Sequence, residues 1–361
     1  ADQLINTNET GKKAFVLRGG RLYELPEGLV SFVPKQMGPF LRSGLLSWTG
    51  LARMGLDVVM PRGPAQGDES LASFFRRRFG AQAFERVLEP LMAGIYAGDA
   101  EQMSVKATFP RFVELEQEHG SIIRGMMAAK KKQPPAPASG LKRTMFVSLR
   151  NGLGDLVTAL TARLAQQGVE LRTTCQVDAL RVRSHQPGRW MYDLILNDGS
   201  ALSAEALVLA TPAYVSAELL RPLTPIAGGL LDLIPYASTA TVAMAFPAQA
   251  VAGAVEGFGF IVPRAEARDL IAATWTSLKW PHRAPADQVL SRCYVGGVGR
   301  EAILQLNDDQ MIAKIRADLA ALCGITAEPT YVEVNRWWKA MPQYALGHLD
   351  RLTQLEAALS R

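Results

Sequence analysis

The sequence is poor in the residues that build metal, thiol and nucleophile chemistry. Its 361 residues include three cysteines and four histidines. Cys175, Cys293 and Cys323 lie far apart, with no pair at metal-ligand spacing, so we expect buried, reduced thiols in a cytoplasmic protein. The histidines are also isolated, and no Ser/His/Asp or Cys/His set is evident. This composition argues against metal-dependent and covalent nucleophilic catalysis.

Long apolar stretches are missing as well. No run of eighteen or more uncharged apolar residues occurs, so we expect no membrane-spanning helix. No secretory signal is visible, and the first residues resemble the middle of a longer protein. The hydrophobic content of 48% and charged content of 20% are those of an ordinary globular protein, and the length allows two or three domains.

The charge balance favours a negatively charged partner. A net charge of +5 suits nucleic acid, an anionic lipid surface or a substrate with carboxylates, although such an excess also serves solubility alone. No recognition-helix, zinc-finger or ribonucleoprotein motif is present. Nucleic acid is therefore the least supported of the three partners.

Residues 74–105 carry the most information. Asp68 or Ser70 can cap a first helix, which Gly80 ends, and a second helix follows. That helix runs into Ala93-Gly94-Ile95-Tyr96-Ala97-Gly98-Asp99, where small residues surround one tyrosine. Such a segment lets the backbone approach a large flat partner, because few side chains keep the partner away. A tight packing joint between a helix and a loop explains the same residues.

Other segments predict local structure. Residues 14–25 indicate a hairpin with a glycine turn, and residues 34–62 indicate one or two amphipathic helices. The apolar, aromatic and basic residues of 34–62 fit either a membrane surface or packing against the next helices. Residues 130–140 indicate a mobile basic loop.

Residues 144–211 indicate a strand–turn–helix–strand unit, with the returning strand at 169–177, followed by a meander. In the meander, an Asn197-Asp198-Gly199 hairpin turn leads to a strand at 202–209, and residues 207–212 indicate a buried strand that ends in small residues. The turn Gly152-Leu153-Gly154-Asp155-Leu156-Val157 resembles a dinucleotide fingerprint. Val157 stands at the third glycine position, however, and would hold the helix away from the strand. Residues 221–335 indicate an antiparallel sheet with helices on one side. The strands are expected at 239–246, 257–262, 290–295 and 330–334, and a helix is expected at 308–322.

Seven blocks in order along almost the whole chain resemble the protoporphyrinogen oxidase family of FAD enzymes, part of the flavin amine oxidase superfamily. Each block alone is a weak signal, and their order makes the signal strong. The blocks are RRRFGAQAFERVLEPLMAGIYAGDAEQMSVKATFP (76–110), FVSLRNGLGDLVTAL (146–160), LVLATP (207–212), GFGFIVP (257–263), RCYVGG (292–297), RWWKAMPQY (336–344) and GHLDRL (347–352).

The resemblance implies a fold of mixed α+β and α/β class with an FAD-linked oxidase architecture. Part of an FAD domain, an antiparallel-sheet substrate domain and a helical insertion are expected. The implied divisions are a strand hairpin of the substrate domain (1–34), a helical insertion that covers substrate or faces a membrane (35–140), a portion of the FAD domain (141–212), the substrate-binding domain (213–335) and a return to the FAD domain (336–361).

The resemblance also implies a reaction: oxidation of protoporphyrinogen IX or coproporphyrinogen III to the porphyrin, in haem biosynthesis, by hydride transfer to FAD with oxygen as the common acceptor. The protein then supplies orientation, an apolar slot and an anchor for propionates, and needs no catalytic acid–base pair. A related flavin amine oxidase or carotenoid desaturase, and a non-catalytic tetrapyrrole-binding module, are the alternatives. The FG…EP…AG…GD segment and GFGFIVP favour the porphyrinogen branch.

Matching the blocks residue by residue implies a site. Arg18 is expected to pair with a propionate, since a guanidinium fits a carboxylate in two parallel hydrogen bonds. Thr274 departs from the apolar or aromatic residue usual in the family. Ordinary structural roles explain the same residues. The expected substrate contacts are Arg18, Gly94, Ala97, Ile261, Thr274 and Tyr294, and the expected FAD contacts are Val177, Ala210 and Trp337.

Two features of the family do not occur in the chain: the GxGxxG turn that opens the family pattern and the glycine-rich segment that ends it. We therefore expect a partial sequence that binds FAD poorly by itself. A cytoplasmic location is expected, with peripheral contact to the inner face of the cell membrane and a homodimer as further expectations.

Overall fold

The computed structural model divides the chain into two compact units, and each is described by itself. Unit 1 comprises Ala1–Arg150 and Tyr236–Leu346, and unit 2 comprises Asn151–Pro235 and Gly347–Arg361. The functional divisions expected within these units stay predictions. The residues that the structure describes are 3–26, 37–63, 67–132, 144, 146–186 and 189–360.

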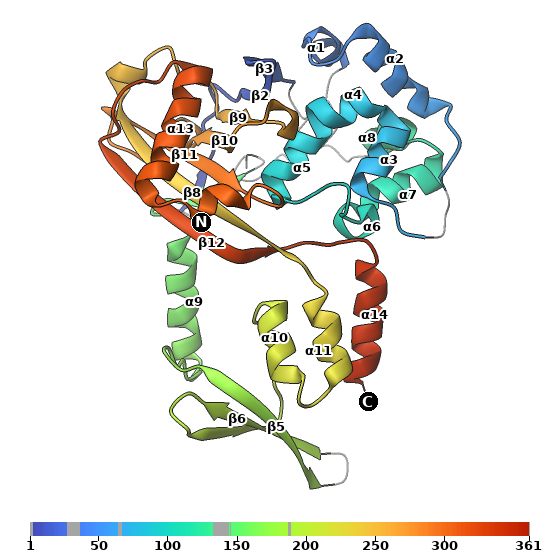
Figure 1. The fold of residues 1–361 in the computed structure, drawn as a ribbon, viewed down its shortest axis with the longest axis vertical. Coiled ribbons are helices and arrows are strands. Elements are labelled where there is room, and N and C mark those ends of the chain that lie inside the picture. Colours follow the sequence, from blue (N-terminus) through green and yellow to red (C-terminus); the bar gives the residue numbers. More distant parts are fainter. Residues whose placement is uncertain are drawn as a thin grey trace. The chain divides into compact units, whose positions relative to one another are not determined.

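A seven-stranded sheet lies at the centre of unit 1 (Figure 1), with the strand order β12-β8-β11-β10-β9-β2-β3. Neighbouring strands are antiparallel, as expected, except that β2 and β9 run parallel. The predicted hairpin at 14–25 thus joins a sheet built mostly from residues 236–342. The strands are β2 (Ala14–Arg18), β3 (Arg21–Leu25), β8 (Tyr236–Pro247), β9 (Gly259–Ile261), β10 (Leu270–Trp275), β11 (Gln288–Gly296) and β12 (Tyr331–Pro342).

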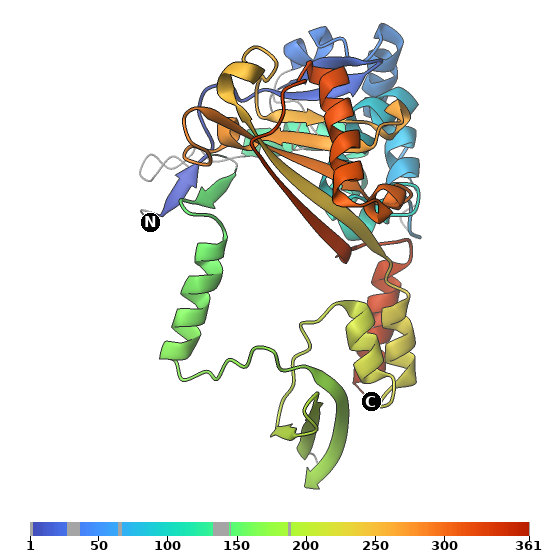
Figure 2. The same cartoon turned by 60° about the vertical axis from the view of Figure 1, so that its left-hand side comes forward.

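The two faces of this sheet differ, because successive residues of a strand point to opposite sides. One face is covered by α13 (Asp308–Cys323), visible across the sheet in Figure 2, whose Met311, Ile315 and Leu319 are fully buried in a core with the sheet. Helix α13 begins with a capping box formed by Asn307 and Gln310. Residues on the other side of the central strands are half-buried; we call this side the open face, defined by Thr241, Ile261, Ala272, Thr274 and Tyr294.

A group of helices forms the rest of unit 1 around a second core, rich in phenylalanine. Helix α3 follows its sequence signals: the Ser70 side chain accepts a hydrogen bond from the N–H of Ser73, and Gly80 ends the helix at φ 85°. The helices are α1 (Met37–Arg42), α2 (Trp48–Gly55), η2 (Leu56–Val58), α3 (Leu71–Phe79), α4 (Ala81–Ala83), a π-helical turn η3 (Phe84–Leu88), α5 (Glu89–Tyr96), α6 (Val105–Thr108), α7 (Pro110–His119) and α8 (Ile122–Lys132).

Shorter elements complete unit 1. Strands β1 (Leu4–Asn6) and β4 (Val147–Leu149) pair antiparallel with each other. The predicted basic loop at 130–140 begins at the end of α8, and its residues 133–140 lie outside the described part of the chain. The remaining elements are η4 (Ala248–Val251), η5 (Arg264–Glu266), α12 (Thr276–Lys279) and η6 (Glu301–Gln305).

Unit 2 contains a three-stranded antiparallel sheet of order β5-β6-β7 and four helices. The Asn197-Asp198-Gly199 turn joins β6 to β7 as predicted, with Gly199 at φ 81°. Its elements are α9 (Gly154–Gln166), β5 (Val177–Gln186), β6 (Arg189–Leu196), β7 (Ala201–Ala204), α10 (Ala213–Leu220), α11 (Pro225–Asp232) and α14 (His348–Leu359).

Two strand predictions in unit 2 are wrong. Residues 169–177 form no strand before β5 begins at Val177, and residues 207–212 form no strand. The strand expected at 202–209 is confirmed only in its first residues, as part of β7. A buried strand needs neighbours that accept its backbone hydrogen bonds, and no described strand pairs with either segment. Val208 is consequently 87% exposed, although its apolar run predicted burial.

The cysteines and the helix lengths bear on two further expectations. Cys293 is fully buried, but Cys175 and Cys323 are only partly buried, which corrects the expectation of three buried thiols; all three are free. Among the helices of the described ranges, none combines the length and apolarity needed to cross a membrane.

Candidate functional site

Three of the predicted substrate contacts are close neighbours on the open face. Ile261 pairs with Ala272, and Ala272 pairs on its other side with Tyr294. Thr274 is the next residue of β10 on the same face, because it lies two positions beyond Ala272. Neighbouring strands lie about 4.8 Å apart, so Ile261 and Tyr294 are separated by about 10 Å. The three side chains form a continuous half-exposed surface across three strands.

Arg18 and Trp337 belong to the same face. Arg18 lies two positions after Val16, the register partner of Ile261. Trp337 pairs with Thr239, which lies two positions before Thr241 on β8. The indole of Trp337 is 54% exposed. The open face thus continues from Arg18 on β2 to Trp337 on the edge strand β12.

The end of α5 is attached to this sheet by backbone contacts. The carbonyl of Ala97, which ends α5 in a left-handed conformation, accepts a 2.8 Å hydrogen bond from the N–H of Val298. Gly297 permits this approach, because a Cβ there would lie 2.8 Å from the Ala97 carbonyl oxygen. The side-chain amide of Gln343 donates to the carbonyl of Tyr96 at 3.0 Å. Ala97 is therefore buried where α5 meets the sheet, which agrees with a packing joint, and its predicted contact with the substrate stays a prediction.

Gly94 has a different environment from Ala97. It is exposed, and a Cβ built on it would lie 3.6 Å from Cγ2 of Ile261, with no other atom closer than 4 Å. The backbone of α5 therefore lies next to the edge of the Ile261 side chain and leaves space above it. The structure brings Gly94 and Ile261 together, as the site prediction required.

Arg18 is held by backbone oxygens rather than by an acid. Its Nη1 donates to the carbonyl of Gly44 at 2.5 Å and to the carbonyl of Leu45 at 3.4 Å. Its guanidinium carbon lies 5.6 Å from the centre of the Tyr23 ring. No ion pair joins Arg18 to a carboxylate of the described residues. Its position agrees with the predicted anchor role, which remains a prediction.

A second charged group lies where α5 meets the sheet. Nε of Arg264 lies 3.8 Å from Oε1 of Glu89, and Nη2 of Arg264 donates to the carbonyls of Val298 and Gly98. Burial raises the pKa of Glu89, opposed by the charge of Arg264. Burial and the neighbouring Arg264 lower the pKa of Arg300. This group contains both signs of charge, so it suits a structural joint better than an anion site.

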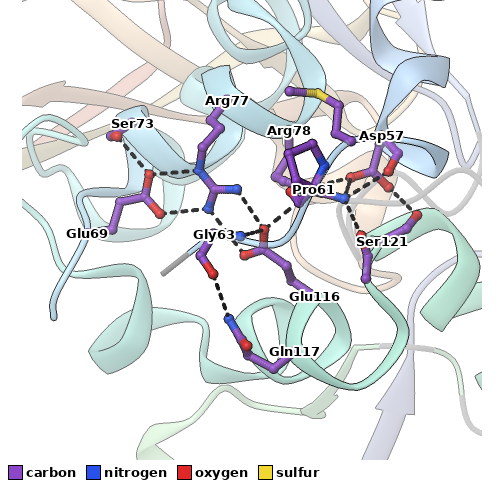
Figure 3. Close-up of polar contacts among 12 residues, drawn as sticks. Asp57, Pro61, Gly63, Glu69, Ser73, Arg77, Arg78, Glu116, Gln117 and Ser121 are labelled. Carbon is purple, nitrogen blue, oxygen red and sulfur yellow. Dashed lines mark hydrogen bonds and ion pairs between the residues drawn. The ribbon is translucent and has the colours of Figure 1, made fainter. Parts of the chain in front are cut away.

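A buried ion network joins η2, α3, α7 and the start of α8 (Figure 3). The Asp57 carboxylate accepts hydrogen bonds from Arg78, from the Ser121 hydroxyl and from the N–H of Ile123. Arg77 connects Glu116 to Glu69, and Arg78 also contacts Glu116 at 3.3 Å. Arg78 and Asp57 are both 0% exposed.

A cavity of about 30 Å³ lies beside this network, lined among others by Glu69, Phe74, Val113 and Glu116. A space of that size has room for about one water molecule. It is too small for a flat ring system, and none of its lining residues belongs to the open face. The candidate site is therefore the open face rather than this cavity.

The chemistry that this arrangement offers is binding rather than proton transfer. The predicted contacts are one arginine, small or apolar residues, a threonine and a tyrosine. Across the part of the chain that the structure describes, no three His, Cys, Asp or Glu side chains gather as metal ligands. Ala272 and Thr241 belong to the same surface but escaped the sequence analysis, because β10 was not predicted and register is not visible in sequence.

The comparisons with known proteins agree with this geometry. Residues 1–360 match the family of flavin containing amine oxidoreductases. The chain belongs to this family, in which FAD is the cofactor.

Within the family, the chain is a member of the porphyrinogen oxidase branch. It is 35% identical over 359 residues to coproporphyrinogen III oxidase of Bacillus subtilis (strain 168), covering 99% of this chain and 74% of that protein. It is 30% identical over 355 residues to chloroplastic protoporphyrinogen oxidase of Oryza sativa subsp. japonica, covering 94% of this chain and 66% of that protein.

Solved structures give the same fold. A crystal structure of a candidate protoporphyrinogen oxidase from Exiguobacterium sp. 255-15 matches with a TM-score of 0.81 and 30% identity, covering 99% of this chain and 74% of that one. A UDP-galactopyranose mutase matches with a TM-score of 0.63 at 14% identity, covering 99% of this chain and 71% of that one, which shows the shared fold alone. The FAD-linked oxidase architecture is therefore confirmed.

The residues predicted to contact FAD lie in both units. Trp337, in unit 1, presents a flat apolar side chain that is half-exposed. In unit 2, Val177 begins β5 opposite Leu196, and Ala210 lies exposed in the irregular segment before α10. The exposed indole of Trp337, taken by itself, fits contact with a large flat cofactor. Their individual roles stay predictions.

Proposed function

We propose that this protein oxidises a porphyrinogen, either coproporphyrinogen III or protoporphyrinogen IX, to the corresponding porphyrin in haem biosynthesis. The carrying observation is that Arg18, Gly94, Ile261 and Tyr294, which come from four separate elements, meet along one half-exposed surface. A flat ring system with carboxylate arms suits an apolar surface with an arginine beside it. The names of the relatives support the same substrate class.

The residues of this chain contribute binding and orientation. FAD would supply the acceptor for a hydride from the substrate carbon. Trp337 of unit 1 is one predicted contact of FAD, and Val177 and Ala210 of unit 2 are the others. Ile261 and Tyr294 support one side of the macrocycle and exclude water from it, while Gly94 leaves space for its edge. Arg18 fixes the orientation through a propionate. Ala97 acts through the backbone, and Thr274 offers a hydroxyl that the family pattern lacks.

Six electrons must leave the porphyrinogen, which requires three successive two-electron oxidations. Oxygen as the final acceptor is part of this proposal, as is a homodimer in solution. Hydrogen peroxide formed in step with porphyrin would support oxygen, and light scattering after size-exclusion chromatography would establish the oligomeric state.

We further propose that the protein is cytoplasmic and contacts the inner face of the cell membrane through the α1–η2 region. Apolar side chains there point to solvent: Trp48 is 80% exposed, Val59 72%, Leu56 50% and Leu41 40%. Exposed apolar side chains next to basic residues are typical of interfacial binding. Sedimentation with anionic vesicles tests this, and Trp48→Ser should reduce the bound fraction; equal binding by the wild type and this variant would contradict it.

The main experiment measures porphyrin fluorescence after coproporphyrinogen III or protoporphyrinogen IX is added to the FAD-loaded protein. A rise in fluorescence that depends on enzyme concentration supports the proposal. A folded, FAD-loaded protein that oxidises neither substrate, but does oxidise an amine, would support the amine oxidase alternative. Porphyrin binding without turnover would support a non-catalytic module.

A further inference from the structure

A second arginine meets Arg18 at the segment between α1 and α2. Nη1 of Arg86, on the π-helical turn before α5, donates to the carbonyl of Leu45 at 3.3 Å. Nη1 of Arg18 contacts the same oxygen at 3.4 Å. One backbone segment between α1 and α2 therefore holds two guanidinium groups that come from distant parts of the sequence.

These two positive charges lie together, and neither forms an ion pair with an acid of the described residues. Arg21, the cross-strand partner of Arg18, adds a third cation. The nearby acids are Glu85, next to Arg86 in sequence, and Glu266, whose carboxylate accepts the N–H of Gly19. Burial, followed by the charge of Arg18, lowers the pKa of Arg86. A bound anion would relieve this repulsion.

The arginine pair also has donors to spare. A guanidinium carries five N–H donors, and within the described ranges Arg18 and Arg86 each bond through Nη1 alone. As far as the described residues are concerned, Nε and Nη2 of both side chains are available to the two oxygens of a carboxylate. Both residues are half-buried, so such a bond is stronger here than on a fully exposed surface.

The pair is placed at one end of the candidate ring-binding surface. Arg18 follows Val16, the neighbour of Ile261, by two residues, which is about 7 Å along a strand. Arg86 precedes Gly94 by eight residues, which is about 12 Å along a helix. A ring lying over Gly94 and Ile261 would bring an arm near both guanidiniums.

We propose that Arg86 is a second carboxylate-binding residue and that it clamps an acidic arm of the substrate together with Arg18. The inference rests on the proposed function and deepens it, because it selects substrates with ionised carboxylates on the side of the ring next to β2 and η3. Arg86 touches the substrate and takes no part in hydride transfer.

The test compares the binding of coproporphyrin III with that of its tetramethyl ester, which keeps the ring and loses the charges. Binding is followed by porphyrin fluorescence in the FAD-loaded protein, for the wild type, Arg86→Gln, Arg86→Lys, Arg18→Gln and the double variant. Arg111→Gln is the control, since Arg111 lies on α7, its side chain is 58% exposed and it pairs with Glu114 on the same helix. Melting temperatures verify folding.

We expect Arg86→Gln to weaken coproporphyrin binding about 10- to 100-fold, the effect of losing one charge-assisted hydrogen bond, while the ester binds as before. Arg86→Lys should weaken coproporphyrin binding less than Arg86→Gln does. The double variant should lose less affinity than the product of the two single losses, because both arginines bind the same carboxylate arm. Arg111→Gln should match the wild type.

Three results would overturn the inference. If Arg86→Gln binds coproporphyrin within twofold of the wild type while Arg18→Gln binds it clearly more weakly, Arg86 is not a carboxylate-binding residue. The proposed function would be unaffected by that result. If Arg86→Gln loses the same affinity for coproporphyrin III as for its tetramethyl ester, Arg86 has a structural role and does not bind a carboxylate. A folded wild-type protein that binds no porphyrin at all would refute the proposed function itself.

Discussion

Replacing Arg78 by methionine is the sharpest perturbation of the scaffold that carries the site. Arg78 and Asp57 are both 0% exposed, and Arg78 also donates to the carbonyls of Pro61, Asp57 and Gly120. Methionine fills much of the volume but leaves the Asp57 carboxylate without its cation. Breaking one side of a buried ion pair costs about 3–5 kcal/mol, because the remaining charge stays desolvated.

The control for this variant is Arg76→Met on the same helix. Arg76 pairs with Glu101, and their side chains are 38% and 55% exposed, so its removal should cost less than about 1 kcal/mol. In a large domain, a loss of 1 kcal/mol in the free energy of unfolding lowers the melting temperature by about 2 °C. Arg78→Met should therefore lower the melting temperature of unit 1 by about 6–10 °C. Differential scanning calorimetry at one scan rate measures both variants. Equal melting temperatures for the two would refute the reasoning.

Three further predictions follow from the site and its surroundings. Gly94→Ala should keep the stability of the fold or raise it by up to about 1 kcal/mol. Gly94→Leu should fold but bind porphyrin at least about tenfold more weakly, because its side chain would fill the space proposed for the edge of the ring. Equal porphyrin affinity in Gly94→Leu and the wild type would contradict a binding site at Gly94. Burial favours a raised pKa for Glu116, but hydrogen bonds from Arg77 and from the N–H of Gly63 outweigh burial and lower this pKa. The ionised Glu116 therefore stabilises the fold at any pH above its pKa in the unfolded chain. This stabilisation is lost as the pH falls through the lower pKa of the folded protein. Glu116→Gln should therefore melt lower at pH 7 and lose less stability between pH 5 and pH 3; parallel pH curves would argue against this. Burial raises the pKa of Cys293 and of Cys323 to about 12, so both thiols stay protonated at pH 8. Iodoacetamide at pH 8 should therefore modify Cys175 first, which mass spectrometry would show. Equal labelling of all three cysteines in the folded protein would contradict this prediction.

Local signals in the sequence predicted the elements whose ends they mark. Ser70 and Gly80 delimit α3, and the Asn197-Asp198-Gly199 turn forms its hairpin, because caps and turns depend on a few adjacent residues. The helix expected at 308–322 is confirmed as α13, which Asn307 caps.

Features that depend on distant residues could not be predicted in the same way. The apolar run at 207–209 predicted a buried strand, but a strand forms only where a neighbour pairs with it. The parallel pairing of Val16 with Ile261 joins residues about 245 positions apart, and no local pattern encodes it.

The same limit applies to the candidate site. Family resemblance identified Arg18, Gly94, Ile261 and Tyr294, and the structure brings them to one surface. Arg86 escaped the sequence analysis, because a helical arginine looks like any solvent-exposed charge until its contact with Leu45 places it next to Arg18.

The most direct test of the central claim is a crystal structure of the FAD-loaded protein with coproporphyrin III. The account predicts that the macrocycle lies over Ile261 and Tyr294 with its edge at Gly94, and that one propionate contacts both Arg18 and Arg86. A porphyrin bound elsewhere, with the open face of the sheet left in contact with solvent, would contradict the account.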